Sequence, residues 1–290
     1  MADVLQLLVA GLATGAVYML AAVGFTLVWQ TAQTVNFAQG EFVMVPAFVV
    51  LFALNVLGLP FAAAIMAGIA AGILVLGFLF KQAVVEPTTR HGALPLAIST
   101  IALALLLKEG VKAFSGADAQ PFPPLATDSV SIAGAAVPLH SLIAIIVAVA
   151  AVAALQAFLD RTPTGRSIQA TAQNPAVARV LGIRIERVIL YAFLINAALT
   201  ALAAILVAPI YLANFTNGEW LGLCAFVAAI GGGLTMRGAI VGGLVLGFLD
   251  NLAAAYLSAT YRGALPLLVL LAVALVRPQG LLGRSEEPAV

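Results

Sequence analysis

The sequence predicts an all-α membrane protein, a bundle of about eight or nine membrane-spanning segments that include short or broken helices. The composition is the first reason: 63% of the 290 residues are hydrophobic and only 9% are charged, whereas soluble globular proteins carry about 25% charged residues. The second reason is that the apolar residues form repeated runs near the length of about 20 residues that a helix needs to cross a bilayer. We therefore treat residues 1–290 as a single transmembrane domain.

The first part of the chain contains five predicted spans. They are expected at Val4–Val28, Phe37–Leu57, Pro60–Phe80, Leu94–Leu107 (with a frayed end to Phe114) and Pro138–Leu159. The polar segment Gln30–Asn36 carries no charge, so it is either an exposed loop or a break inside the membrane. The charged segment Lys81–His91 is predicted to be a loop. Residues 115–137 form a long polar connection, in which the alternating run Ser129–Gly134 is typical of a small hairpin.

The last part of the chain contains four more predicted spans, and they are shorter and richer in glycine. They are expected at Val188–Ala213, Trp220–Thr235, Ala239–Leu257 and Ala264–Val276. Glycines four residues apart, as at Gly238/Gly242 and Gly243/Gly247, let helices approach closely in lipid. This spacing indicates close packing within the chain, or dimerisation through one of these faces.

Asp160–Arg187 separates the fifth and sixth spans and fixes the predicted orientation. It contains Arg161, Arg166, Arg179, Arg184 and Arg187. Short loops that keep Lys and Arg lie on the cytoplasmic side, so residues 160–187 are expected in the cytoplasm and residues 115–137 outside. Alternation then places the N-terminus outside and the C-terminus in the cytoplasm, and only Lys108, Lys112 and Arg262 of the 13 cations fall on the outer side.

The interior of this cytoplasmic segment is predicted to form two short helices at an angle. Asn174 is a suitable N-cap and Pro175 suits the first turn of a helix, so the second helix is expected to begin near Pro175. Small residues lie along one side, at Ala170, Ala178 and Gly182. The segment is either a simple loop or an arginine-rich helix that docks into a groove of another protein.

The break before the second span is the predicted substrate path. Asn36 and Gln39 have the spacing of a capping box, so Asn36 is expected to start a helix, with Glu41 about one turn inside it. A helix that starts within the protein offers free N–H groups and a positive dipole end to a polar substrate. We expect Glu41 to hold the broken helix by hydrogen bonds. The alternative is that Glu41 lies at the cytoplasmic interface and only stabilises the helix start.

Three other polar residues lie in or beside the spans: Asn196, Glu219 and Asp250. Acidic residues within membrane segments usually face the bundle interior or a cavity. Asn196 and Asp250 are therefore added to the candidate substrate path, and Glu219, next to Trp220, is expected to be an interfacial anchor.

Several classes of function are excluded or disfavoured by the sequence. No lysine stands in a phosphate-binding Gly-x-x-x-x-Gly-Lys loop, and neither a nucleophile elbow nor a His-Glu-x-x-His pair occurs. One cysteine, Cys224, and two distant histidines, His91 and His140, indicate no metal site. The cations flank the membrane and form no basic face, so no nucleic-acid partner is expected. The chain is predicted not to be an enzyme and to bind no cofactor itself; a self-contained secondary transporter or channel for a small polar solute remains an alternative.

Four motifs, in order along nearly the whole chain, carry a resemblance to a known family. They are Asn36–Glu41 (Asn-Phe-Ala-Gln-Gly-Glu), Ala172–Ile183 with its Ala-Gln-Asn-Pro start, the glycine run Gly231–Gly247, and Arg277–Gly283 (Arg-Pro-Gln-Gly-Leu-Leu-Gly). Together they resemble the permeases of the branched-chain amino acid ABC importers, in particular the shorter, LivH-like of the two permease subunits.

This resemblance implies a multi-pass permease of the bacterial plasma (inner) membrane. Its implied partners are a LivM-like permease or a second copy of the chain, two cytoplasmic ATPases that hold ATP and Mg²⁺, an extracytoplasmic binding protein, and membrane lipid. The implied substrates are branched-chain or other hydrophobic amino acids, and the family also covers amides, urea and aromatic acids. It further implies that residues 160–187 dock on the ATPases through Ala172, Asn174, Pro175, Ala178, Arg179, Gly182 and Arg184.

Overall fold

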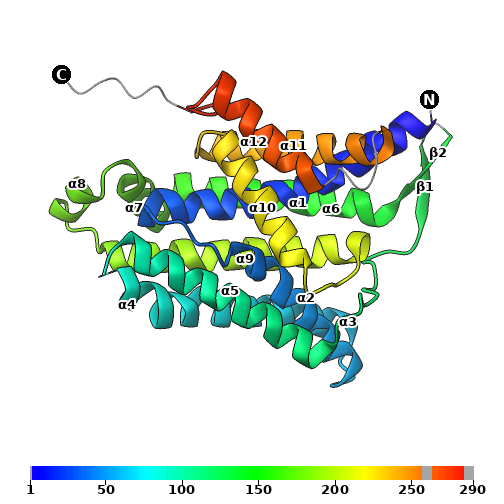
Figure 1. Cartoon of the computed structure of the whole chain (residues 1–290), viewed down its shortest axis with the longest axis horizontal. Helices are drawn as coiled ribbons and strands as arrows, with labels where there is room; N and C mark the ends of the chain where they lie inside the picture. The colour runs from blue at the N-terminus through cyan, green and yellow to red at the C-terminus, as the bar shows by residue number, and fades with distance from the viewer. Residues whose placement is uncertain (1, 90, 133, 257–262, 284–290) are drawn as a thin grey trace.

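Helix α1 (Ala2–Ala32) lies at the centre of a bundle of long helices, with one small β-hairpin at one end (Figure 1). The computed structural model describes residues 2–89, 91–132, 134–256 and 263–283. From Ala13 to Val28 nearly every side chain of α1 is buried, since α6, α9, α10 and α11 all pack against it. The first predicted span is thus confirmed as a helix, one turn longer at its end.

The second span begins later than predicted. Helix α1 ends at Ala32, and α2 (Gln39–Asn55) starts only after a non-helical stretch and a turn at residues 37–38. Gln33, at the start of this stretch, has φ 52°, a left-handed conformation that interrupts the helix. The expected helix start at Asn36 is wrong, because the first residue of α2 is Gln39.

The prediction of a loop at Lys81–His91 is wrong, because the helical segment that begins with α3 continues through most of these residues. Helix α3 (Phe61–Ala71) runs without interruption into two π-helical segments, η1 (Gly72–Leu79) and η2 (Lys81–Val85), and then into α4 (Glu86–Thr89). Lys81 is 7% exposed, and its Nζ lies 2.7 Å from Oε2 of Glu86. Because Lys81 finds a counter-charge on its own helix, its charge does not end the span.

Helix α5 (Ala93–Ser115) is continuous where a frayed end was expected, and it stops at Gly116 with φ 83°. The predicted hairpin is confirmed: β1 (Ser129–Ile132) pairs antiparallel with β2 (Ala135–Pro138), with Ile132 opposite Ala135. The second strand takes in Pro138, so α6 (Leu139–Arg161) begins one residue later than predicted.

Residues 160–187 contain the two predicted short helices, α7 (Pro163–Gln173) and α8 (Pro175–Val180). The ends of the segment belong to its neighbours, because Asp160 and Arg161 complete α6 and α9 (Ile185–Tyr211) begins before Arg187. The predicted start of the second helix at Pro175 is confirmed.

The last three helices are α10 (Asn217–Gly231), α11 (Met236–Tyr256) and α12 (Leu265–Val276). Helices α1 and α11 pack closely along their length, because Gly15 and Gly247 meet backbone to backbone. The glycine spacing in this part of the sequence is therefore used for packing within the chain.

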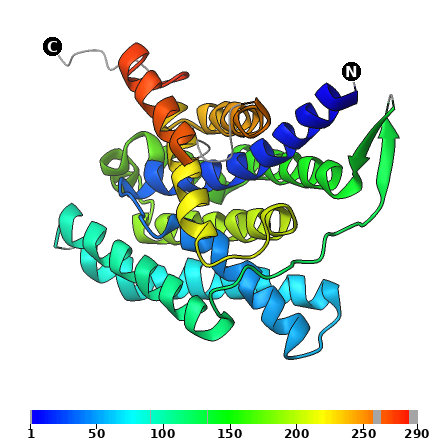
Figure 2. The same cartoon turned by 45° about the vertical axis from the view of Figure 1, so that its right-hand side comes forward.

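The two ends of the bundle differ in what they carry. Near the start of α1, Gln6 Nε2 donates to the Ala136 carbonyl of the hairpin at 3.0 Å, and Figures 1 and 2 both show the hairpin beside this end. At the other end, α7 and α8 lie near the end of α1 (Figure 1). Gln30 there donates to the Leu234 carbonyl, and Leu281 N–H donates to the Gly231 carbonyl. The described part of the chain thus begins at one end and finishes at the opposite one.

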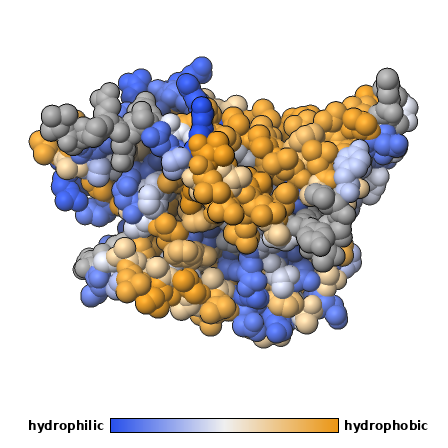
Figure 3. Space-filling model, turned by 45° about the horizontal axis from the view of Figure 1, so that its top comes forward, coloured by the Kyte–Doolittle hydropathy of each residue, from blue (hydrophilic) through white to orange (hydrophobic). Residues whose placement is uncertain are grey.

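The outer surface fits a membrane. In the described residues, six helices are long and apolar enough to cross a bilayer, at Asp3–Ala32, Phe61–Thr88, Ala93–Ser115, Leu139–Arg161, Ile185–Tyr211 and Met236–Tyr256; α2 and α12 are shorter apolar helices. Figure 3 shows broad apolar areas on this face of the molecule, with polar side chains at the left, the right and the lower centre of the view. Arg262, which was expected on the outer side, lies outside the described residues.

Candidate functional site

The chain between α1 and α2 runs from the end of the bundle near Gln30 back to a helix start inside the bundle. Gln39, the first residue of α2, donates from Nε2 to the carbonyl of Ala21 at 3.3 Å and to Oδ1 of Asn196 at 2.9 Å. Asn196 lies roughly 16 Å along α9 at 1.5 Å per residue, well away from either end of that helix. Irregular backbone at this depth is tolerated only where protein buries it or where it lines a cavity. The segment combines features of both alternatives, since Gln33 is exposed where it begins and Asn36 is buried inside the bundle where it ends.

Gln39 holds the broken helix, in place of the capping role expected for it. Asn196 Nδ2 returns a hydrogen bond of 2.9 Å to Oε1 of Gln39, so the two amides satisfy each other. Both are nearly fully buried, at 3% and 0% exposure. Gly24 makes room for the pair, since a Cβ there would collide with Asn196 Oδ1. Because the Gln39 side chain is used in this pair, it cannot reach back to Asn36 and close the predicted capping box.

Asn36 forms a tighter local turn. Its Oδ1 accepts the N–H of Ala38 at 3.0 Å, while the first helical residue is Gln39. The side chain is 4% exposed, and its Nδ2 has no hydrogen-bond partner among the described residues.

Helices α2 and α10 cross at their first turns with almost no side chain between them. A Cβ on Gly40 would collide with the carbonyl of Gly218, and a Cβ on Gly222 would come within 2.8 Å of the Gly40 Cα. Such a contact requires glycine on both helices. The N-terminal ends of two short helices therefore meet at one point inside the bundle.

A pocket of about 360 Å³ lies beside this crossing, between α2, α5 and α10. This volume is near the lower end of the range of small-molecule sites, about 300–1,000 Å³. The wall is mostly apolar, and the polar side chains on it belong to Asn36, Gln39, Glu41 and Glu219. Its apolar part is formed by Phe25, Val35, Phe37, Ile101, Ala104, Leu105, Leu223 and Phe226.

Glu41 is the buried acid of this pocket, so the interfacial alternative does not describe it. Its side chain is 3% exposed, and Oε2 has no hydrogen-bond partner among the described residues. Gly218 makes room for the carboxylate, because a Cβ there would come within 2.6 Å of Oε2. The anchoring role expected for Glu41 is performed by Gln39.

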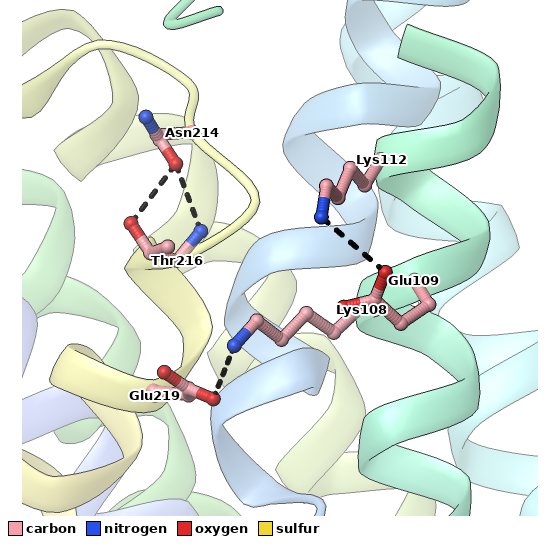
Figure 4. A network of polar contacts seen from close by, with 6 residues as sticks. All are labelled: Lys108, Glu109, Lys112, Asn214, Thr216 and Glu219. Atoms are coloured by element: carbon pink, nitrogen blue, oxygen red, sulfur yellow. Dashed lines mark hydrogen bonds and ion pairs between the residues drawn. The ribbon is translucent and has the colours of Figure 1, made fainter. Parts of the chain in front are cut away.

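An ion pair bridges α5 and α10 beside the pocket, a feature that the sequence analysis missed. Lys108 Nζ lies 2.6 Å from Oε1 of Glu219 (Figure 4), and Lys112 Nζ lies 3.6 Å from Oε2 of Glu109 on the same helix. Lys108 and Lys112 also lie over the ring of Phe215, at 5.9 and 5.4 Å. Only the position of the two lysines on the side opposite residues 160–187 hinted at this pairing. Glu219, expected to be an interfacial anchor, thus forms an ion pair with Lys108 of a neighbouring helix.

Asp250 belongs to a separate cluster and is not among the residues that line this pocket. It is fully buried in α11, where Tyr18 donates its hydroxyl to Oδ2 at 2.9 Å and Tyr211 does so at 3.4 Å. Trp220 Nε1 donates in turn to the Tyr18 hydroxyl at 3.2 Å. Asn196 also lies behind the pocket wall, where it holds Gln39. The structure thus brings Asn36, Gln39 and Glu41 together and leaves Asn196 and Asp250 off the pocket surface.

At the α7–α8 end, the predicted contact residues divide into exposed and buried ones. Asn174, Pro175, Arg179, Gly182 and Arg184 are exposed and Ala172 is half-buried. Asn174 is the predicted cap, as its Oδ1 accepts the N–H groups of Ala176 and Val177 at 3.0 and 3.1 Å. Ala178 is 1% exposed, so the expectation that it contacts a partner is corrected: its side chain packs inside the chain.

Three exposed apolar side chains on α8 and its end were not singled out in the sequence. Val177, Val180 and Leu181 are 53%, 88% and 72% exposed. Gly182 follows with φ 84° and closes α8, because its N–H donates to the Arg179 carbonyl and that of Ile183 to the Ala178 carbonyl. An apolar patch of this kind on a polar, arginine-rich element is typical of a protein contact.

Two of the sequence motifs pack on each other at this same end. Gly280 and Gly233 both have φ 81°, and their backbones are in direct contact. The Leu281 N–H donates to the Gly231 carbonyl at 2.7 Å. The segment Arg277–Gly283 therefore closes over the turn that follows α10.

Comparison with known proteins agrees with the arrangement described above. The family model described as "Branched-chain amino acid transport system / permease component" matches residues 7–274. The chain is 31% identical to the high-affinity branched-chain amino acid transport system permease protein LivH of Escherichia coli (strain K12), over 99% of this chain and 97% of LivH. It is likewise 31% identical to the corresponding permease protein BraD of Pseudomonas aeruginosa, over 99% and 98% of the two chains.

A more distant relative is the probable LivH permease of Methanocaldococcus jannaschii, at 26% identity over 91% of this chain. A match that spans the bundle from α1 to α12, with relatives aligned over nearly their full length, settles the classification. The chain is a multi-pass membrane protein of the branched-chain amino acid transport permease family.

Proposed function

We propose that this chain is a permease subunit of an ATP-driven ABC importer in the bacterial inner membrane, and that the pocket beside Glu41 is part of its translocation path. The proposed cargo is a branched-chain or other hydrophobic amino acid, or a related amide or carboxylate, delivered by an extracytoplasmic binding protein. A second permease, LivM-like or a further copy of this chain, and two cytoplasmic ATPases carrying ATP and Mg²⁺ would complete the importer.

The observation that carries this proposal is the pocket at the crossing of two half-length helices. Helices α2 and α10 both start inside the bundle, and their N-terminal ends, with their partial positive charge, meet at Gly40 and Gly218. Transporters place their binding sites at such interrupted helices near the middle of the membrane. The apolar wall suits an apolar side chain, and Asn36 and Glu41 supply polar groups.

The orientation is part of the proposal. The end with α7 and α8 carries the arginine-rich segment, so the positive-inside rule favours placing it in the cytoplasm. The hairpin and the start of α1 would then face outward, with the C-terminal side in the cytoplasm. The apolar patch of Val177, Val180 and Leu181 would contact an ATPase on that side.

A self-contained secondary transporter is the alternative, and energy coupling separates the two. The test is to co-express the chain with its candidate permease and ATPase partners and purify it by an affinity tag. Uptake of radiolabelled leucine is then measured in proteoliposomes supplied with the binding protein. Co-purification of ATPases and uptake that requires ATP support the importer. Uptake by the chain alone, driven by an ion gradient, would overturn it.

A further inference from the structure

Two buried polar atoms of opposite kind lack partners beside the same pocket. In the described residues, three buried side-chain atoms have no hydrogen-bond partner: Thr26 Oγ1, Asn36 Nδ2 and Glu41 Oε2. Asn36 and Glu41 both line the pocket. Buried polar groups are satisfied in the great majority of cases, so each such exception requires an explanation. One explanation fits both atoms, because the first is a donor and the second an acceptor.

The orientation of the Asn36 amide is fixed by its own turn. Its Oδ1 accepts the Ala38 N–H at 3.0 Å, so the remaining group, Nδ2, is the free donor. An amide N–H in an apolar wall is suited to a carboxylate, since hydrogen bonds to a charged acceptor are stronger than those between neutral groups.

Glu41 offers the complementary group. Its carboxylate is 3% exposed and lies against Gly218, and the nearby Lys108 is already paired with Glu219 at 2.6 Å. A buried carboxylate is costly unless it is paired and hydrogen-bonded. An ammonium group entering the pocket would supply both the countercharge and the donors that Glu41 lacks.

We propose that Asn36 and Glu41 recognise the two ends of a zwitterionic α-amino acid, with Asn36 Nδ2 donating to the carboxylate and Glu41 Oε2 accepting from the ammonium group. The inference rests on the proposed function, in that it concerns cargo passing through this pocket. The side chain of the cargo lies against the apolar wall, formed in part by Phe25, Leu105 and Phe226. Glu41 is then a specificity residue that distinguishes amino acids from 2-oxo acids, and Asn36 one that distinguishes them from simple amines.

The test uses three probes with the same side chain. L-leucine carries both end groups, 4-methyl-2-oxopentanoate lacks the ammonium, and 3-methylbutylamine lacks the carboxylate. The reporter is Ala104→Cys on the pocket wall. The native Cys224, the one cysteine of the sequence, is replaced by alanine so that the reporter thiol is the only one. The purified full chain in nanodiscs is treated with a small methanethiosulfonate, and the rate of modification is measured against the concentration of each probe.

Two nearly isosteric variants separate the two contacts. Asn36→Asp keeps the oxygen that accepts the Ala38 N–H but removes the donor, and Glu41→Gln keeps an acceptor but removes the charge. We expect leucine to protect the thiol best. Glu41→Gln should raise the half-protective concentration of leucine and the amine by at least about tenfold and leave the 2-oxo acid unchanged. Asn36→Asp should raise the half-protective concentration of leucine and the 2-oxo acid to a similar extent, and it should not raise that of the amine.

Glu109→Gln is the matched control, because Glu109 is exposed on α5 and is not among the residues lining this pocket; it should shift none of the three values. Size-exclusion chromatography and thermal melting verify that each variant is folded. The comparison of the three probes in the reporter protein alone needs neither variant. Equal protection by all three probes, unselective loss in either variant, or no protection at all would overturn the inference. Each of these results leaves the ATPase co-purification, which tests the proposed function, unaffected.

Discussion

Gln39 and Asn196 exchange two hydrogen bonds of 2.9 Å, joining the first residue of α2 to the middle of α9. The pair is buried, so neither amide can turn to water if its partner is lost. The start of α2, with Asn36 just before it and Glu41 in its first turn, is thus held by a contact that extends behind the pocket wall. Gln39 and Asn196 therefore have a structural role, whereas Asn36 and Glu41 have polar groups available to a ligand.

We predict that Gln39→Leu and Asn196→Leu each lower the free energy of unfolding by about 1–3 kcal/mol, because each leaves one buried amide without its partner. The double variant should cost less than the sum of the two single ones. Unfolding in a denaturing detergent measures all three. Gln82→Leu, an exposed glutamine on η2, is the control and should change little. Fully additive effects would mean that the pair is not energetically coupled.

The crossing of α2 and α10 gives a second prediction. Gly40→Ala should sharply reduce both transport and the yield of folded protein, because its Cβ would collide with the Gly218 carbonyl and force the helices apart. The matched control is Gly110→Ala inside α5, where a Cβ would meet nothing within 4 Å. That substitution should be neutral or stabilise the helix by about 0.5–1 kcal/mol. Wild-type transport in Gly40→Ala would show that the crossing is looser than described.

Much of the fold was predictable from the sequence, because apolar runs must form helices in lipid. The long helices, the hairpin and the start of α8 at Pro175 all followed from local patterns. The error at Lys81 has a physical origin: a charge usually marks the end of a span, but here Glu86 lies close enough to neutralise it. A pairing of this kind depends on helix geometry, so the hydropathy of the sequence alone does not predict it.

The site was predictable only in part. Asn36, Gln39 and Glu41 were found because they lie together in an uncharged polar break, which is a local signal. Their separate tasks depend on partners far along the chain, namely Asn196 for Gln39 and Gly218 for Glu41. No local pattern relates residues that lie more than 150 positions apart, so the anchoring role was assigned to Glu41 when it belongs to Gln39.

The orientation gives a third prediction. Cysteines placed at Gly116 and Gln173, in a Cys224→Ala background, should react with an impermeant maleimide from opposite sides of the membrane. Both positions are exposed, Gly116 at the end of α5 and Gln173 at the end of α7. In intact spheroplasts we expect Gly116→Cys to be labelled and Gln173→Cys to be labelled only after permeabilisation. Labelling of both in intact cells would contradict the proposed topology.

The last prediction concerns the proposed contact with the ATPases. Gly182→Leu should leave the chain inserted but uncouple ATP hydrolysis from transport. A side chain at Gly182 has open space around it, so its bulk would stand on the surface beside Val180 and Leu181 and hold a docked partner away. The measurement is ATPase co-purification together with ATP-driven uptake in the complete complex.

Two further variants separate backbone strain from docking, because the φ of 84° at Gly182 adds strain of roughly 1–2 kcal/mol for any side chain. Gly116→Leu introduces a side chain at a comparable φ of 83° at the other end of the bundle and should keep the ATPases bound. Leu181→Ser removes an exposed apolar contact without a glycine substitution and should weaken co-purification. Normal coupling in both Gly182→Leu and Leu181→Ser would exclude this surface as the docking site.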